Sequence, residues 1–183
     1  MRKNTFFDKN KFILTAILLF ALDFGVTWYL INFGPGGLDE GNPLFEIDGG
    51  YLALVVNFLY LFLVFGLEKL VFNKYKTIVL DASSRIEYTK KIYKSDRTDF
   101  VVISIVFAFV LSTFSSRMMA IIDWVVYGFY KGEFRNTKYA ILRSKMPFGR
   151  YDSLVAILSL IVFYILWFHI EYRKSEKLLK RRI

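Results

Sequence analysis

The sequence predicts an all-α integral membrane protein, a bundle of four transmembrane helices with its N- and C-termini in the cytoplasm. The first reason is that 55% of the 183 residues are hydrophobic and gather in four runs long enough to cross a bilayer. The second is that a backbone inside the hydrocarbon core has to bond internally, which favours α-helices. The third is that the charged residues, which sum to +9, separate by sign between the runs.

The expected spans belong to one membrane domain, residues 1–183, and cover about residues 12–33, 50–72, 100–127 and 154–172. Basic residues precede the first span, as they do in a secretory signal. That span is too long for a signal peptide, whose apolar region has about 7–15 residues, and no small-x-small cleavage site follows it. We therefore expect an uncleaved anchor. The third run contains Arg117, so its second half could instead be re-entrant or interfacial.

The orientation follows from the distribution of charge. The loop 34–49 has four acids and no Lys or Arg, whereas the N-terminal tail, the loop 73–99 and the tail 173–183 are basic. By the positive-inside rule the basic segments lie in the cytoplasm. There they would contact anionic lipid at the inner face of the cell membrane, which explains the charge without nucleic acid. One loop breaks the rule, because it would place six basic residues outside: Lys131, Arg135, Lys138, Arg143, Lys145 and Arg150.

The basic loop 73–99 also contains apolar residues near helical spacing. This pattern predicts an amphipathic helix on the inner membrane surface, and a solvated helix or loop is the alternative. The residues concerned are Ile78, Val79, Ala82, Ile86 and Tyr93.

Polar residues inside the spans are costly, so each is a candidate for function. Asp23, Asn57 and Arg117 fall at similar depth on three different spans, and Thr27 shares a helix face with Asp23. One hypothesis is a polar site at the centre of the bundle for an ion, a proton or a headgroup. The other is an ion pair between Asp23 and Arg117, helped by Asn57, that sets the register of the helices.

The third span has small residues at every fourth position, which allow helices to approach closely. The simplest interpretation is a packing seam inside the molecule, and the alternative is a contact between copies or with another membrane subunit. The stripe consists of Ser104, Ala108, Ser112, Ser116 and Ala120.

Catalytic motifs are scarce. The chain has no G-x-S-x-G, no H-E-x-x-H and no phosphate-binding glycine loop. It has no cysteine and one histidine, so we expect neither a metal nor another cofactor. The sequence therefore predicts a binding or assembly component, or one that handles a small solute or ion, rather than an enzyme.

The first part of the chain resembles a widespread family of small membrane proteins with no established activity. The similar features are an L-D-x-x-x-T pattern at residues 22–27 and E-x-N-P at residues 40–43, each next to a span. The likeness covers roughly the first 70 residues. That family usually has a lysine in its second helix, where this chain has Asn57 or another polar residue. The resemblance implies a membrane location and little chemistry.

A weaker likeness is to signal peptidase II, a four-span aspartyl peptidase whose active site faces outward. Residues 123–129 look like that family's D-R-x-x-x-G-F piece, and residues 146–153 look like its F-P-x-F-N-x-A-D-S piece. The resemblance implies that Asp152 would share a proton with a second carboxylate, Asp123 or Glu133. The chain departs from the pattern, because Trp124 replaces the family's arginine and the expected catalytic aspartate falls at a glycine.

Overall fold

The computed structural model describes residues 9–34, 51–70, 75–129 and 138–181. Within these ranges every regular element is helical, so the all-α prediction is confirmed for the described residues. The elements are α1 (Lys9–Phe33), α3 (Tyr51–Glu68), α4 (Arg85–Lys94), α5 (Thr98–Phe129), α6 (Lys138–Arg143), the 3-10 helix η3 (Pro147–Gly149) and α7 (Tyr151–Leu179).

Four helices are long and apolar enough to cross a membrane, which agrees with the predicted number of spans. These candidate spans are Lys11–Phe33, Tyr51–Glu68, Thr98–Val126 and Tyr151–Leu179. The third run is one continuous helix, so it is not interrupted at Arg117. The fourth helix exceeds its expected range of 154–172, because it starts earlier and continues through much of the basic C-terminal tail.

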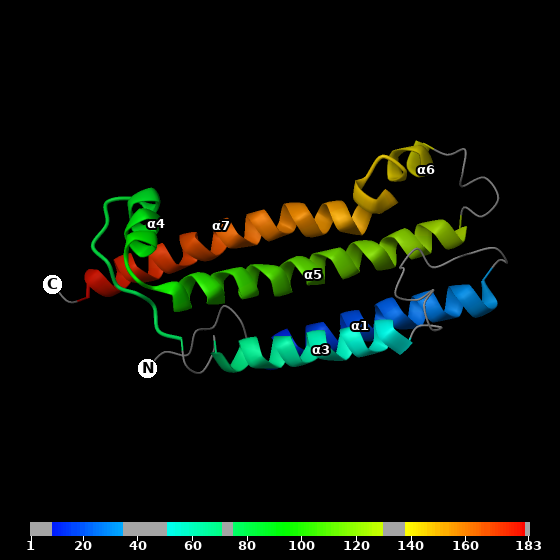
Figure 1. Cartoon of the computed structure of the whole chain (residues 1–183), viewed down its shortest axis with the longest axis horizontal. Helices are drawn as coiled ribbons and strands as arrows, with labels where there is room; N and C mark the ends of the chain where they lie inside the picture. Colours follow the sequence, from blue (N-terminus) through cyan, green and yellow to red (C-terminus); the bar gives the residue numbers. More distant parts are fainter. Residues whose placement is uncertain (1–8, 35–50, 71–74, 130–137, 182–183) are drawn as a thin grey trace.

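The long helices alternate in direction, and α5 lies between α7 on one side and α1 with α3 on the other (Figure 1). The most extensive packing is between α5 and α7. Helix α1 begins and α7 ends at the same end of the molecule, where α4 also lies (Figure 1). We name this the α4 end. The opposite end, where α6 lies, is the α6 end.

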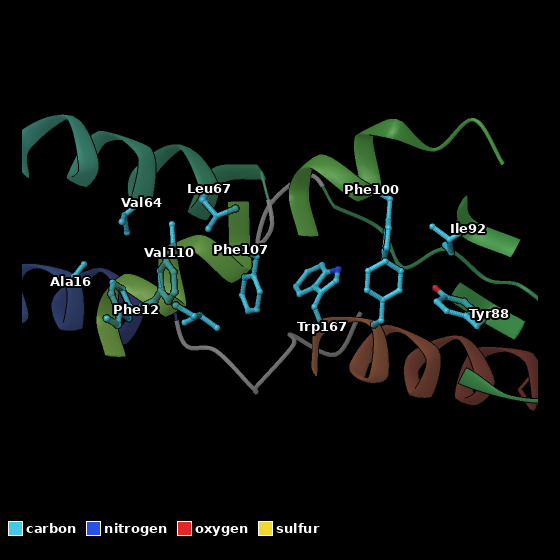
Figure 2. Packing of buried hydrophobic residues seen from close by; sticks show 13 residues of the cluster. Phe12, Ala16, Val64, Leu67, Tyr88, Ile92, Phe100, Phe107, Val110 and Trp167 are labelled. Carbon is cyan, nitrogen blue, oxygen red and sulfur yellow. The ribbon is translucent and has the colours of Figure 1, made fainter. Parts of the chain in front are cut away.

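The core is a mainly aromatic cluster that extends along α5 toward the α4 end (Figure 2). The ring centroid of Trp167 on α7 lies 4.5 Å from that of Phe107 and 6.4 Å from that of Phe100. Phe12 of α1 packs against Phe114 of α5 at 5.4 Å. Large rings bury much apolar area, at about 25 cal/mol per Å², so this cluster supplies much of the packing energy.

Trp167 also defines the register between α5 and α7. The two helices run antiparallel, so each step back along α7 matches a step forward along α5. Tyr151 precedes Trp167 by sixteen residues and is therefore level with residues 116–123 of α5. Helix α7 thus begins well before the level at which α5 ends, and α6 lies beside the last turns of α5 (Figure 1).

The outward faces of the long helices are apolar. On α7 the exposed fractions of five aliphatic side chains range from 48% to 58%. A soluble bundle would carry polar residues at such positions, whereas helices facing lipid carry apolar ones. The five residues are Ile157, Leu158, Ile161, Val162 and Ile165.

The small-residue stripe of α5 lies inside the molecule. Ser104 and Ala108 are fully buried, and Ser112 and Ala120 are at most 7% exposed. The hydroxyl of Ser104 donates to the carbonyl of Phe100 at 2.7 Å, so its burial leaves no unmet donor. Four of the five stripe residues are therefore packed inside the chain, in agreement with a seam within the molecule, and a contact between copies stays a prediction.

Replacing Ala108 with leucine should destabilise the protein by about 1–3 kcal/mol, because a filled seam has no room for three more carbons. The matched control is Val102 to leucine on the same helix, where the side chain is 57% exposed and the change should be tolerated. Denaturant unfolding in lipid nanodiscs measures both. Equal stability of the two variants would show that the seam is not tightly packed.

The amphipathic helix predicted in the basic loop is only partly present. Residues 75–84 are not helical, so the pattern over Ile78, Val79 and Ala82 does not form a helix. Helix α4 begins after Ser84, whose hydroxyl accepts from the backbone N–H of Glu87 at 3.2 Å.

Helix α4 also buries a different face from the one that the pattern indicated. Tyr88 and Ile92 are fully buried, whereas Ile86 is 65% and Tyr93 53% exposed. The hydroxyl of Tyr88 donates to the carbonyl of Ile78 at 2.9 Å, which ties α4 to the extended segment before it. The sequence pattern failed here because the burial of this short helix is decided by its contact with α7 rather than by its own periodicity.

Candidate functional site

Three of the polar residues predicted inside the spans meet at one point. Arg117 of α5 donates from Nη1 to Oδ2 of Asp23 on α1 at 3.0 Å, and from Nη2 to Oδ1 of Asn57 on α3. The amide nitrogen of Asn57 donates to the carbonyl of Ala53 at 2.7 Å, which orients its oxygen toward the guanidinium. Thr27 is buried one turn after Asp23 but is not a partner of Arg117. One side chain therefore joins three helices.

Aromatic rings hold the guanidinium in place. Cζ of Arg117 lies 5.9 Å from the ring centroid of Phe20 and 5.2 Å from that of Tyr60. The Tyr60 hydroxyl accepts from Thr113 and donates to the carbonyl of Val110 at 3.3 Å, so this ring is itself fixed. A cation over two rings gains about 0.5–2 kcal/mol per ring, more where water is excluded. Arg117 is thus pre-organised rather than free to sample rotamers.

Two further ion pairs lie between this point and the α6 end. Nε of Arg150 donates to Oδ1 of Asp152, and Nε of Arg143 donates to Oδ2 of Asp123, each at 2.9 Å. The hydroxyl of Tyr139 donates to the second oxygen of Asp123. Tyr139 and Arg143 both belong to α6, so this short helix is attached to α5 by polar contacts.

The three ion pairs lie in the same part of the molecule. Arg150 and Asp152 are near enough to Asp23 to influence its charge. Tyr151, next to Asp152, packs on the ring of Tyr139, which bonds to Asp123. Each pair contains one acid and one arginine, so the series is neutral as a whole. We call it the ion-pair ladder, which consists of Asp23–Arg117, Asp152–Arg150 and Asp123–Arg143.

The ladder extends from the middle of α5 toward the α6 end. Arg117 and Asp123 are six residues apart, which is about 9 Å along the helix axis. On the other side of Arg117 the core is apolar (Figure 2). The side-chain exposure is 25% at Asp23, 14% at Asp152 and 9% at Asp123. The most open carboxylate is therefore the one in the middle of a candidate span.

The carboxylates considered for a peptidase have other partners. Asp152 and Asp123 are each held by their own arginine, whereas an aspartyl dyad needs two carboxylates that share one proton. Glu133 lies outside the described residues.

A second polar cluster, at the α4 end, was not found from the sequence. Glu171 of α7 is fully buried, and its carboxylate accepts from the Tyr75 hydroxyl at 2.9 Å and from Nζ of Lys174 at 2.8 Å. The buried Ser175 hydroxyl bonds to both the backbone N–H and the carbonyl of Leu80, at 2.9 and 3.1 Å. These bonds fasten the extended segment 75–84 to α7. No sequence motif signals them, since the partners are about 95 residues apart.

Tyr75 and Tyr139 are among the tyrosines outside the candidate spans whose pKa is raised. Burial raises the pKa of Tyr75, and the neighbouring Glu171 carboxylate raises it further. Burial likewise raises the pKa of Tyr139, with a further increase from the bond to Asp123. Both phenols therefore stay protonated at all physiological pH values and act as hydrogen-bond donors.

The residues around Arg117 that sequence reasoning missed differ in how they could have been found. Tyr60 is one turn after Asn57 and Phe20 is one turn before Asp23, so helical spacing would have placed both on the same faces. The approach of Arg150 and Asp152 to Asp23 has no such signal, because it depends on the level at which α7 begins.

Over the residues that the structure describes, fold and site define an all-helical arrangement with four helices long and apolar enough to cross a membrane and with three acid–arginine pairs toward the α6 end. Comparison with known proteins adds no family: no family model, no curated protein and no solved structure matches the chain.

Proposed function

We propose that this chain is a multi-pass protein of the cell membrane and that its four long helices cross the bilayer. The α4 end, where α1 begins and α7 ends, then lies in the cytoplasm, and we expect both chain termini on the same side. Two observations support this: the exposed apolar faces of the long helices, and the exposed basic side chains at the α4 end. Those basic side chains would contact anionic lipid headgroups. They include Lys90, Lys94, Arg97 and Lys177.

The proposed function is the binding of a small polar solute at the ion-pair ladder, from the outer side of the membrane. The observation that supports it is the contact of Arg117 with Asp23 and Asn57, with two more ion pairs between this point and the α6 end. Polar groups of this kind are costly inside a bilayer, and they commonly mark the path of a solute or ion. The aromatic core lies between Arg117 and the α4 end, which is the cytoplasmic side in the proposed orientation.

The neutrality of the ladder restricts the ligand. A solute with a net charge would leave an uncompensated charge in a medium of low dielectric constant, which is strongly unfavourable. A zwitterion can instead exchange its anionic group for Asp23 on Arg117 while its cationic group meets Asp23 or Asp152. We therefore expect a small molecule with one anionic and one cationic group.

Zwitterions should raise the thermal unfolding midpoint of the protein in nanodiscs. The probes are glycine, glycine betaine and taurine, which are net neutral near pH 7, with acetate and methylammonium as singly charged comparisons. At one hundred times the dissociation constant the stabilisation is about 2.7 kcal/mol. Asp23 to asparagine should abolish the shift, whereas Glu176 to glutamine, in an exposed pair with Lys180, should preserve it. The proposal is contradicted if no zwitterion acts, or if acetate acts equally and independently of Asp23.

A further inference from the structure

Helix α6 is positioned at the level of a candidate span rather than beyond its end. Tyr139 and Arg143 contact Asp123, which lies inside the span Thr98–Val126. The Tyr139 ring packs on Tyr151 at 4.8 Å between centroids, and the Tyr151 hydroxyl donates to the carbonyl of Tyr139 at 3.0 Å. Helix α7 begins level with residues 116–123, so it does not accompany the last turns of α5. The segment 138–150 lies beside those turns instead (Figure 1).

The polarity of α6 is reversed relative to that of a helix in water. Two of its polar side chains, Tyr139 and Arg143, point toward α5 and are bonded there, whereas Lys138, its first residue, is exposed. Its aliphatic side chains, Ile141 and Leu142, are 51% and 50% exposed. At the same level α5 exposes Ile122, also at 51%. Water at this surface would be unfavourable for the exposed aliphatic groups, whereas acyl chains would not.

Five backbone N–H groups in the connection after α6 have partners within residues 138–150. After α6, the N–H groups of Ser144, Lys145 and Met146 donate to carbonyls of α6 at 2.9–3.1 Å. In the next turn, Gly149 donates to Met146 and Arg150 to Pro147, at 2.9 and 3.2 Å. Irregular backbone at membrane depth is tolerated only where its polar groups find partners within the protein.

We propose that residues 138–150 form a re-entrant element in the outer leaflet, with Ile141 and Leu142 against lipid acyl chains. Lys138 and Lys145, both exposed, flank the aliphatic pair and reach the headgroup region along their flexible stems. This inference rests on the membrane orientation proposed above and is independent of the ligand.

The same placement describes four of the six basic residues of the third loop. Arg143 and Arg150 pair with Asp123 and Asp152 within the protein. Lys138 and Lys145 would lie at the outer headgroups, and Lys131 and Arg135 lie outside the described residues. Because the positive-inside rule counts Lys and Arg rather than net charge, this loop still departs from it.

The experiment is site-directed spin labelling, which the chain permits without further changes because it has no cysteine. Single variants Ile141→Cys and Leu142→Cys are labelled and reconstituted in vesicles of phosphatidylcholine and phosphatidylglycerol. Ile161→Cys, 55% exposed on α7, is the lipid control, and Lys180→Cys, 72% exposed near the end of the chain, is the water control. Collisions with oxygen report lipid, and collisions with a nickel chelate report water.

We expect labels at 141 and 142 to resemble the label at 161, with at least a several-fold higher ratio of oxygen to nickel collisions than the label at 180. Nickel accessibility at 141 and 142 would place α6 in water and overturn the inference. Low collision with both reagents would show that protein, such as a second copy, covers α6, and would also overturn it. If the label at 161 itself reports water, the proposed membrane insertion fails, which is a distinguishable result.

Discussion

Replacing Arg117 with alanine should lower the free energy of unfolding in nanodiscs by about 3–5 kcal/mol. The change leaves Asp23 without its counter-charge and Asn57 without its donor, in the middle of three packed helices. It also removes the cation from between the rings of Phe20 and Tyr60. A buried ion pair is not necessarily stabilising as a whole, but breaking one side of it is costly because the remaining charge stays desolvated.

The matched control is Arg173 to alanine, whose side chain is 61% exposed and whose pair with Glu176 is long, at 3.5 Å. An exposed pair of this kind contributes little, so this variant should unfold like the wild type. Chemical unfolding followed by tryptophan fluorescence compares the two. A loss at Arg117 no larger than that at Arg173 would show that the pair is solvated and would remove the basis for a buried ladder.

The charge-swapped double variant, Asp23→Arg with Arg117→Asp, separates the two hypotheses for this pair. If the pair serves helix register alone, the swap should recover much of the stability lost in the single variants. In that case the wild type should show no binding of zwitterions. If the pair is a binding site, Asp23 to asparagine should retain the fold and lose the response to the ligand. The double variant distinguishes coupling between the two residues from two independent losses.

Replacing Glu171 with alanine should detach the segment 75–94 from α7, with a loss of about 3 kcal/mol. The carboxylate is fully buried and accepts from both Tyr75 and Lys174, so its removal takes the acceptor away from the Tyr75 phenol and from the partly buried Lys174 ammonium. We expect faster hydrogen exchange over this segment, while α5 stays protected. The effect is local because the candidate spans are held mainly by the aromatic core, not by this cluster.

Glu176 to alanine is the control, since this glutamate pairs on the surface of the same helix with Lys180 at 2.9 Å. Its exchange pattern should match that of the wild type. Equal protection of residues 75–94 in the Glu171 variant and the wild type would show that Ser175 and the buried face of α4 hold the segment without the carboxylate.

Much of the candidate site could be derived from the sequence. Asp23, Asn57 and Arg117 were placed at a common depth by counting helix rise, and the structure brings these three together. Thr27 was placed on the correct helix face but does not reach Arg117. The sequence did not connect Asp152 with Asp23, because its expected fourth span began at residue 154 and its third loop was taken to lie outside the bundle.

The failures share one physical cause. The extended segment 75–84 looks helical by spacing, but its polar groups find better partners in Ser175 and Glu171, which lie far along the chain. Likewise, α4 buries Tyr88 and Ile92 because α7 packs against that face. Short elements have little intrinsic stability, so tertiary contacts override their local pattern.

By itself the sequence determined the number of long helices, their approximate bounds and the residues too polar to lie in them without partners. These are local properties, since the apolar length of a helix and the cost of a buried charge can be read along one segment. Only the tertiary structure decided that three acids and three arginines form one neutral series and that α6 lies beside α5. Both depend on the register between α5 and α7, which is set where Trp167 of α7 packs against Phe100 and Phe107 of α5. The sequence alone does not bring these two helices together.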